Sequence, residues 1–271
     1  MSWGILAGQG LLPLEVGRGM RNEGIEPVVL CLGDNAGQFE EAGFTVGRVQ
    51  FGQLGSALRF LKEHQVDEMV MAGRVGKESL LTGAVDPEIM GIFTKLTDKN
   101  DDALQLAIVD YFEAHGIRIE TQTRFLKHLI PDRGVLTGPA LSREEEADLR
   151  LGYRMAKEIG RLDIGQSVVV KKGMVLAIEA VEGTDQTILR GGQYGGPGVV
   201  VVKVAKPQQD FRFDVPAVGL TTIQALIKAK ARVLGVEAGA TFILDREKLL
   251  AEAEKHGVTV VALDDPAIKD N

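Results

Sequence analysis

The chain is short of the residues on which several common functions depend. Its 271 residues include a single cysteine, which excludes an internal disulfide framework. Cys31 lies in the apolar run 28–32, so we expect a buried, inert thiol. The four histidines are dispersed and lack the spacing of zinc ligands: His64, His115, His128 and His256. No P-loop or Gly-x-Ser-x-Gly sequence occurs, which argues against a P-loop NTPase and a serine hydrolase.

Excess positive charge and long apolar runs are missing as well. The formal net charge is −7, which argues against broad binding of nucleic acid. No apolar run approaches the roughly 18 residues of a membrane-spanning helix. The chain does not open on a basic leader, and we therefore expect a cytoplasmic protein that meets any lipid from the surface. The hydrophobic content of 45% is typical of a globular protein with a core in each half.

The first half of the chain alternates between strand-like and helix-like periodicity. This βαβ order predicts an α/β, Rossmann-like domain with a parallel sheet and helices on both faces. Short apolar strands are expected at 3–7, 26–32, 44–49, 68–72 and 117–120, and amphipathic helices at 11–23, 53–64 and 101–115.

Turn residues cluster at 131–139, where the periodicity lapses. We therefore expect a Rossmann-like domain over 1–134 and a second, mixed α/β domain over 135–271, with a cleft between them. A capping box, Ser142 to Glu145, opens the first helix of the second domain. Strands are expected there at 167–171, 175–180, 199–204, 241–244 and 258–262, and helices at 142–160, 221–234 and 246–256.

Two carboxylates follow one of these strands. The run 198–205 is typical of a buried strand, and after it come Asp210 and Asp214 with Arg212 between them. Open α/β sheets bind ligands beyond their strand ends, and paired carboxylates can hold a hard cation such as Mg2+. An extended segment would place these three polar side chains on one face. The alternative is an ordinary polar turn in which Arg212 pairs with one aspartate.

A second acidic turn ends another expected strand. Glu182 and Asp185 flank Thr184, a favourable N-cap residue for the helix that begins there. The free N–H groups of a helix start suit an anion such as phosphate. The alternative is a simple capped helix without a ligand.

Glycines and cations follow two strands of the first half. Gly8-Gln9-Gly10 lies between a strand and a helix, where phosphate can bind, although the full glycine spacing of a dinucleotide fingerprint is absent. Arg74 and Lys77 leave the strand 68–72 and could grip a phosphate. A tight turn and exposed solvated charges are the respective alternatives.

In their order along the chain, these motifs resemble those of the LpxI family. The resemblance rests on the turn 182–185 and on the stretch 203–219, which contains Gln209-Asp210, Arg212 and Asp214. Three further motifs and the opening of the chain also resemble that family: 4–13, 73–77, Asp101-Asp102 and 163–170. Asn100 stands where a small residue, usually glycine, is expected, which leaves the role of the Asp101-Asp102 pair open.

The resemblance implies a function. Members of the family are UDP-2,3-diacylglucosamine pyrophosphatases of lipid A biosynthesis. Hydrolysis of this nucleotide-linked glycolipid yields UMP and 2,3-diacylglucosamine 1-phosphate, with Mg2+ as cofactor and with attack on the sugar-side phosphorus. The resemblance also implies peripheral contact with the cytoplasmic face of the inner membrane, and a homodimer.

The same resemblance suggests roles for individual residues. Asp214 is the first choice for metal binding or water activation, with Asp210 as its partner. Glu182 and Asp185 would complete the cation shell or orient the water, and Lys203 and Arg212 would stabilise phosphate charge. The remaining substrate-binding candidates are Gly8, Gln9, Gly10, Arg74, Lys77 and Thr184.

Two other classes of function stay open. A non-catalytic nucleotide-sugar binding or regulatory protein would have no need of all four acids. An NAD(P)-dependent oxidoreductase would need the full glycine fingerprint and an acid at the end of the second strand. The nearest candidate for that acid is in Leu32-Gly33-Asp34.

Overall fold

The computed structural model describes residues 1–74, 85–96 and 101–264, and the chain divides into two compact units. The first unit comprises Met1–Lys127 together with Phe211–Phe213. The second comprises His128–Asp210 and Asp214–Asn271. The chain therefore passes to the second unit at Lys127, a few residues before the expected boundary, and three residues of the predicted second domain belong with the first unit.

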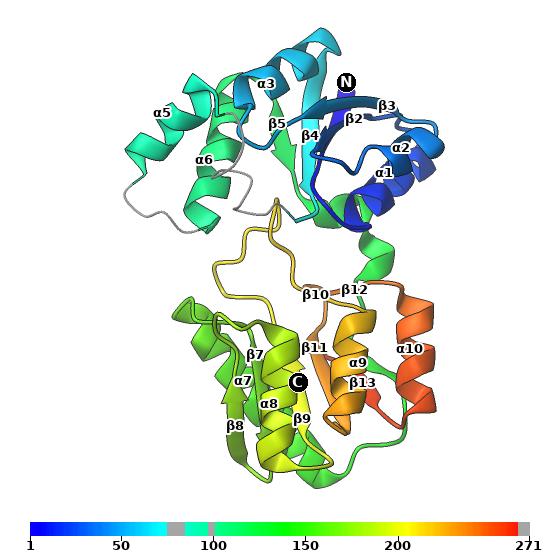
Figure 1. Cartoon of the computed structure of the whole chain (residues 1–271). Helices are drawn as coiled ribbons and strands as arrows, with labels where there is room; N and C mark the ends of the chain where they lie inside the picture. Colours follow the sequence, from blue (N-terminus) through cyan, green and yellow to red (C-terminus); the bar gives the residue numbers. More distant parts are fainter. Residues whose placement is uncertain (75–84, 97–100, 265–271) are drawn as a thin grey trace, which may run out of the picture. The chain divides into compact units, whose positions relative to one another are not determined.

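A five-stranded parallel sheet forms the centre of the first unit, in the order β3-β2-β1-β4-β5 (Figure 1). Its strands are β1 (Ser2–Ala7), β2 (Val28–Leu32), β3 (Thr45–Val49), β4 (Val66–Ala72) and β5 (Arg118–Glu120). This confirms the predicted Rossmann-like domain. Because the order reverses between β1 and β4, the switch point of the sheet lies at the carboxyl ends of these two strands.

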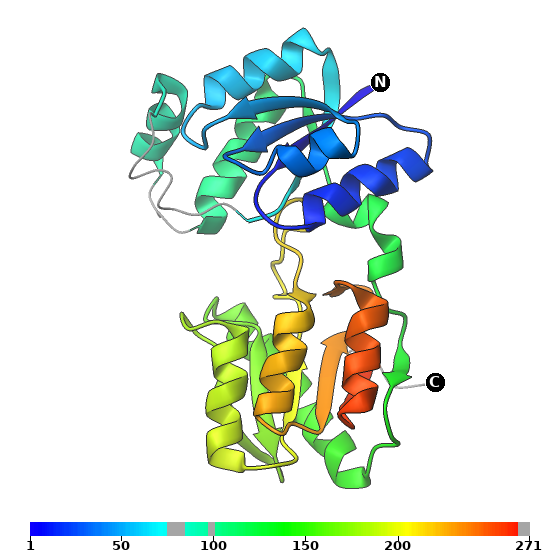
Figure 2. The same cartoon turned by 45° about the vertical axis from the view of Figure 1, so that its right-hand side comes forward.

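Helices cover both faces of this sheet, which is why its central strands are apolar on both sides. The helices are α1 (Leu12–Asn22), α2 (Gly37–Glu41), α3 (Leu54–Glu63), α5 (Pro87–Lys95) and α6 (Asp101–Ala114), with two 3-10 turns at Gln122–Phe125 and Lys127–Leu129. Apolar side chains of α3, α5 and α6 share one core cluster with Leu6, Leu30 and Met69. Figure 2 shows the dark blue α1 on the opposite side of the sheet from the cyan α3.

A six-stranded mixed sheet forms the centre of the second unit, in the order β6-β13-β11-β9-β7-β8. The strands β9, β11 and β13 run parallel, whereas β6, β7 and β8 are joined through antiparallel pairs. These strands are β6 (Gly134–Thr137), β7 (Ser167–Lys171), β8 (Met174–Ile178), β9 (Val200–Lys203), β11 (Val233–Glu237) and β13 (Thr259–Leu263). A short parallel pair, β10 (Ala217–Val218) and β12 (Phe242–Ile243), lies apart from them. The mixed α/β prediction is confirmed.

Both faces of the second sheet are covered as well. The helix α7 (Arg143–Arg161) packs on one face and begins with the predicted capping box, formed by Ser142 and Glu145. The other face carries α8 (Thr184–Gly195), α9 (Leu220–Lys228) and α10 (Arg246–Lys255). No helix in the described part of the chain is both long and apolar enough to cross a membrane.

The predicted helix 221–234 is wrong in its second half. Helix α9 ends at Lys228, Lys230 adopts a left-handed conformation with φ of 53°, and β11 begins at Val233. Val233 and Val236 are fully buried in the middle of the sheet. A short apolar run of this kind has the same appearance in a buried helix and in a buried strand, so periodicity alone does not separate them. Other elements of the described residues were also not predicted: α2, α5, β6, β10 and the two 3-10 turns.

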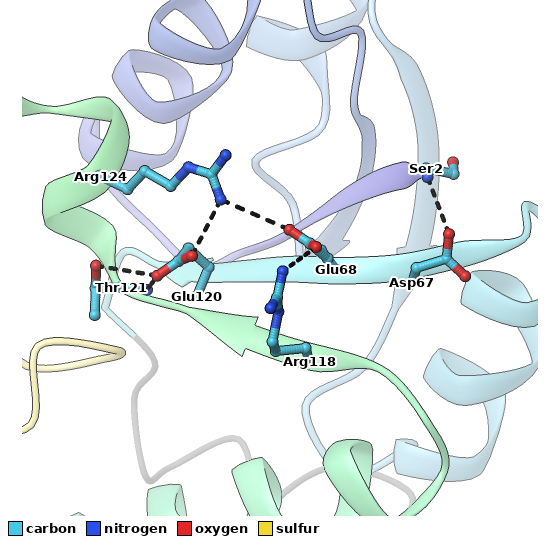
Figure 3. A network of polar contacts seen from close by, with 7 residues as sticks. All are labelled: Ser2, Asp67, Glu68, Arg118, Glu120, Thr121 and Arg124. Carbon is cyan, nitrogen blue, oxygen red and sulfur yellow. Dashed lines mark hydrogen bonds and ion pairs between the residues drawn. The ribbon is translucent and has the colours of Figure 1, made fainter.

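An ion-pair network ties β4 to β5 in the first unit (Figure 3). Glu68 of β4 is buried and forms ion pairs with Arg118 of β5 and with Arg124. Arg124 also bonds Glu120 at 3.1 Å, and the Thr121 N–H donates to the same carboxylate at 2.8 Å. Burial by itself raises the pKa of Glu120, but the contacts with Thr121 and Arg124 outweigh it and hold this pKa below its ordinary value.

Replacement of Glu120 by Gln should therefore lower stability in a pH-dependent way. A carboxylate whose folded-state pKa is depressed contributes stability above its unfolded pKa and loses this contribution as the pH falls through the folded value. We expect Glu120→Gln to lower the free energy of unfolding by up to about 1 kcal/mol at pH 7, as for a partly exposed ion pair. Urea unfolding of both proteins at pH 7 and at pH 3 measures this. An equal difference at the two pH values would contradict it.

Candidate functional site

A buried lysine ends the strand β9. Three valines precede Lys203, and the strand lies within the sheet, so the lysine is carried into the interior with only 8% of its surface exposed. Its Nζ donates to Thr184 Oγ1 at 3.1 Å and to the Ala217 carbonyl at 2.9 Å. An ammonium has three protons. Thr184 at the start of α8 and Ala217 of β10 accept two of them, and the third has no acceptor among the residues that the structure describes.

Thr184 links this ammonium to a buried carboxylate. Its hydroxyl donates to Glu179 Oε1 at 2.8 Å, and Ser167 Oγ lies 3.3 Å from Thr184 Oγ1. The other oxygen of Glu179 accepts from the Gln166 N–H at 3.2 Å. Because Ser167 pairs with Lys203 across β7 and β9, the whole network sits at the end of the sheet where β9 terminates. Glu179 was not predicted as a site residue.

Opposing effects set the charge of Lys203. Burial lowers the pKa of this ammonium below its ordinary value, while the charges of Glu179, Asp185 and Asp214 act to raise it. Asp185 and Asp214 were both predicted from the acidic turns. The structure therefore brings these two carboxylates into electrostatic reach of one buried cation, although the two turns are separated in the sequence by the whole of α8 and β9.

The segment that holds Asp210 and Asp214 is folded into turns. The expected extended geometry is wrong, because the Asp214 N–H donates to the Asp210 carbonyl at 2.9 Å and closes a local turn. The Asp214 carboxylate accepts a hydrogen bond from Gln209 Nε2. Gln209 Oε1 in turn accepts from the Lys206 N–H at 2.9 Å. Gln209 thus fixes the direction of Asp214, a role that the sequence motif does not reveal.

Arg212 belongs with a different part of the chain. Phe211–Phe213 form part of the first unit, where Arg212 pairs with Glu113 at 3.4 Å and Phe213 packs against the apolar core. The Gln122 N–H donates to the Phe211 carbonyl at 2.9 Å. Phe213 thus anchors this short segment in the first unit, and Arg212 belongs to the same unit.

The start of α8 differs from the prediction in two respects. The N-cap is Gly183, with φ of 80°, rather than Thr184, whose hydroxyl is used by Glu179 instead. Glu182 is paired with Arg190 of α8, and its own backbone N–H and Arg190 lower the pKa of its carboxyl group. Of the two acids in this turn, the one in reach of Lys203 is therefore Asp185.

Among the described residues, no three His, Cys, Asp or Glu side chains gather closely enough to hold a metal ion. The predicted set of Asp210, Asp214, Glu182 and Asp185 is thus not a complete protein cage. Mg2+ keeps several waters and is commonly bound by one or two carboxylates together with substrate phosphates. In that second mode, Asp185 and Asp214 are the carboxylates that would hold the ion, and the substrate would supply part of the coordination.

The glycine loop of the first unit pairs with the loop after β4. The Gln9 N–H donates to the Arg74 carbonyl at 2.8 Å, and the Arg74 N–H donates to the Gln9 carbonyl at 2.9 Å. A Cβ at Gly8 would lie 2.7 Å from the Arg74 carbonyl oxygen, so close packing requires this glycine. Gly10 has φ of 102° and open space where a Cβ would be. Gly10 is thus the glycine of this loop beside which a ligand has room.

The structure shows less about the remaining residues that were singled out in the first half of the chain. The Arg74 side chain is exposed, and Lys77 lies outside the described residues. Asp101 and Asp102 are the first two residues of α6. Cys31 is fully buried in β2, and burial raises its pKa to about 11, as expected for an inert thiol.

Comparison with known proteins agrees with these motifs. The chain matches the LpxI N-terminal domain over residues 2–129 and the LpxI C-terminal domain over residues 132–261. It is 33% identical to the UDP-2,3-diacylglucosamine pyrophosphatase LpxI of Caulobacter vibrioides, over 96% of this chain and 97% of that protein. The two domain matches follow one another and together cover most of the chain, and the chain therefore belongs to the LpxI family.

Proposed function

We propose that this protein hydrolyses the diphosphate of UDP-2,3-diacylglucosamine to UMP and 2,3-diacylglucosamine 1-phosphate. Membership of the LpxI family and the activity named for the Caulobacter relative support this reaction. The structural observation that carries the proposal is the buried ammonium of Lys203, with Asp185 and Asp214 in electrostatic reach. A fixed cation beside carboxylates is what the cleavage of a charged anhydride requires.

Asp214 and Lys203 have different roles in the proposed reaction. The water oxygen attacks the sugar-side phosphorus, the bond from that phosphorus to the bridging oxygen breaks, and UMP leaves with the electron pair. Asp214, held by Gln209, accepts the proton of the water. The remaining proton of Lys203 is available to a phosphoryl oxygen, whose charge it stabilises.

We propose Mg2+ as the cofactor. Asp214 and Asp185 would hold it together with the substrate, with Asp210 beside them in the turn that closes on Asp214. When bound, the ion neutralises charge on the phosphoryl oxygens. Asp185 and Asp214 offer too few oxygen ligands for a complete shell. This supports a Mg2+ ion that shares its coordination with the diphosphate.

The setting of the enzyme is also part of the proposal. A diacylated substrate is drawn from a membrane, so we propose cytoplasmic localisation with peripheral contact at the cytoplasmic face of the inner membrane. We further propose a homodimer. Both statements rest on the family resemblance and on the nature of the substrate.

The activity can be tested directly. Purified protein supplied with UDP-2,3-diacylglucosamine and Mg2+ should release UMP, measured by chromatography, and excess EDTA should stop the release until Mg2+ is restored. Folded protein that releases no UMP would contradict the enzymatic function and leave a binding role. Release that continues unchanged in EDTA would contradict the cofactor alone.

Asp214→Ala should abolish turnover while the protein still folds and retains substrate. Loss of the carboxylate removes the proton acceptor and also removes repulsion toward the diphosphate. The matched control is Asp132→Ala, an exposed carboxylate of the same unit. If the Asp214→Ala protein kept more than about a tenth of normal turnover, the activation barrier would have risen by less than roughly 1.4 kcal/mol. That result would show that another carboxylate accepts the proton.

Lys203→Met should lower kcat/KM by at least about 100-fold, or roughly 2.7 kcal/mol, as expected for loss of one fixed group that stabilises transition-state charge. Methionine fills similar volume without the charge. Lys228→Met, which changes an exposed lysine of α9, serves as the control. Circular dichroism and thermal unfolding establish that both variants are folded. A loss of less than about tenfold in folded Lys203→Met protein would remove Lys203 from the chemistry.

A further inference from the structure

An exposed apolar surface lies on the second unit, beside the network that holds Lys203. Its side chains are Leu162 and Ile164, from the turn after α7, and Ile178 and Val181, from the end of β8 and the turn that follows it. All four are exposed, and Val181 is fully exposed. We call these four residues the apolar patch. Exposed aliphatic side chains are common singly, whereas a group of them on one surface marks a site of interaction.

The turn after α7 and the end of β8 are in direct contact. A Cβ at Gly165 would lie 2.3 Å from the Glu179 carbonyl oxygen, so the two backbones approach this closely only because the residue is glycine. Ile164 and Ile178 immediately precede these two residues in the chain. The carboxylate of Glu179 belongs to the hydrogen-bond network of the candidate site. The apolar patch is therefore one surface, and it adjoins that site.

The acids next to the apolar patch are neutralised by cations. Each has a partner: Glu158 pairs with Arg161, Asp163 with Lys206 and Glu182 with Arg190. These ion pairs have no net charge, although the net charge of the whole chain is −7. An anionic surface that approaches the apolar patch therefore meets less repulsion there than the net charge of the chain implies.

The size and shape of the apolar patch fit a bilayer better than a second copy of this chain. Each partner of a stable protein complex buries about 800 Å², and even an aromatic side chain supplies only about 150–250 Å². Four aliphatic side chains, three of them only partly exposed, fall short of that area. Val181 is fully exposed in a turn, a position that suits insertion among lipid headgroups.

We propose that the apolar patch docks onto the surface of a phospholipid bilayer, with Leu162 and Val181 inserted among the headgroups. Burial of these aliphatic side chains at the boundary between headgroups and acyl chains supplies the free energy of docking. The contact places the site of Lys203 beside the membrane from which a diacylated substrate is drawn. The inference rests on the proposed function for the nature of that substrate, and it adds the surface through which the enzyme reaches it.

The test is cosedimentation of the full chain with vesicles of phosphatidylethanolamine and phosphatidylglycerol in equal amounts. The patch variant combines Leu162→Gln with Val181→Gln, which removes apolar surface without adding charge. The matched control combines Val135→Gln with Met174→Gln. These two residues are also exposed, and they lie on the opposite edge strand β6 and at the other end of β8. Circular dichroism and thermal unfolding establish that both variants are folded.

We expect the patch variant to bind the vesicles at least about tenfold more weakly than wild-type protein, in line with the loss of two buried aliphatic side chains. The control should stay within about threefold of wild type. Wild-type protein that does not bind, a patch variant that binds like wild type, or equal losses in both variants would overturn the inference. A wild-type dimer that becomes monomeric in the patch variant, with vesicle binding unchanged, would assign the apolar patch to a second copy of the chain and also overturn it.

Release of UMP separates this inference from the proposed function. With the substrate embedded in vesicles, the patch variant should release UMP more slowly than wild type, in proportion to its loss of vesicle binding. With a short-chain substrate dispersed in water, the two proteins should have equal rates. If wild-type protein releases UMP but its vesicle binding does not depend on the apolar patch, only this inference fails. If vesicle binding depends on the apolar patch but neither substrate yields UMP, the proposed function fails instead.

Discussion

The interaction on which the candidate site depends is the burial of the Lys203 ammonium at the end of β9. Burial of a charge is unfavourable unless hydrogen bonds and opposite charges compensate it. Thr184 Oγ1, the Ala217 carbonyl and the charge of Glu179 provide that compensation here. Groups from α8, from β10 and from the end of β8 therefore stabilise this cation in the interior.

The same arrangement supports the proposed binding of a dianionic diphosphate. Asp185 and Asp214 are close enough to influence Lys203, yet the described residues contain no complete cage for a metal ion. A substrate that brings its own phosphate oxygens would complete both the lysine's hydrogen bonds and the coordination of a shared cation. The second unit thus has a fixed charge and a fixed carboxylate, the latter held by Gln209.

Much of the fold could be predicted from the sequence, because periodicity reports which face of an element is buried. The strands of the first unit and the capping box at Ser142 are examples. The strand β11 could not be separated from a helix, since a short run buried on all sides has no polar face to reveal its period. Asp185, Lys203 and Asp214 were predicted from their motifs. Glu179 and Gln209 were not, because their contacts form only when the chain is folded.

The central claim is that the diphosphate binds at Lys203. The most direct measurement is a crystal structure of Asp214→Ala protein with UDP-2,3-diacylglucosamine and Mg2+, in which turnover is blocked. We predict a phosphate oxygen within about 3.2 Å of Lys203 Nζ, the range of a hydrogen bond, while the contacts with Thr184 and the Ala217 carbonyl are kept. A diphosphate bound elsewhere, with Lys203 still confined to Thr184 and Ala217, would contradict the account.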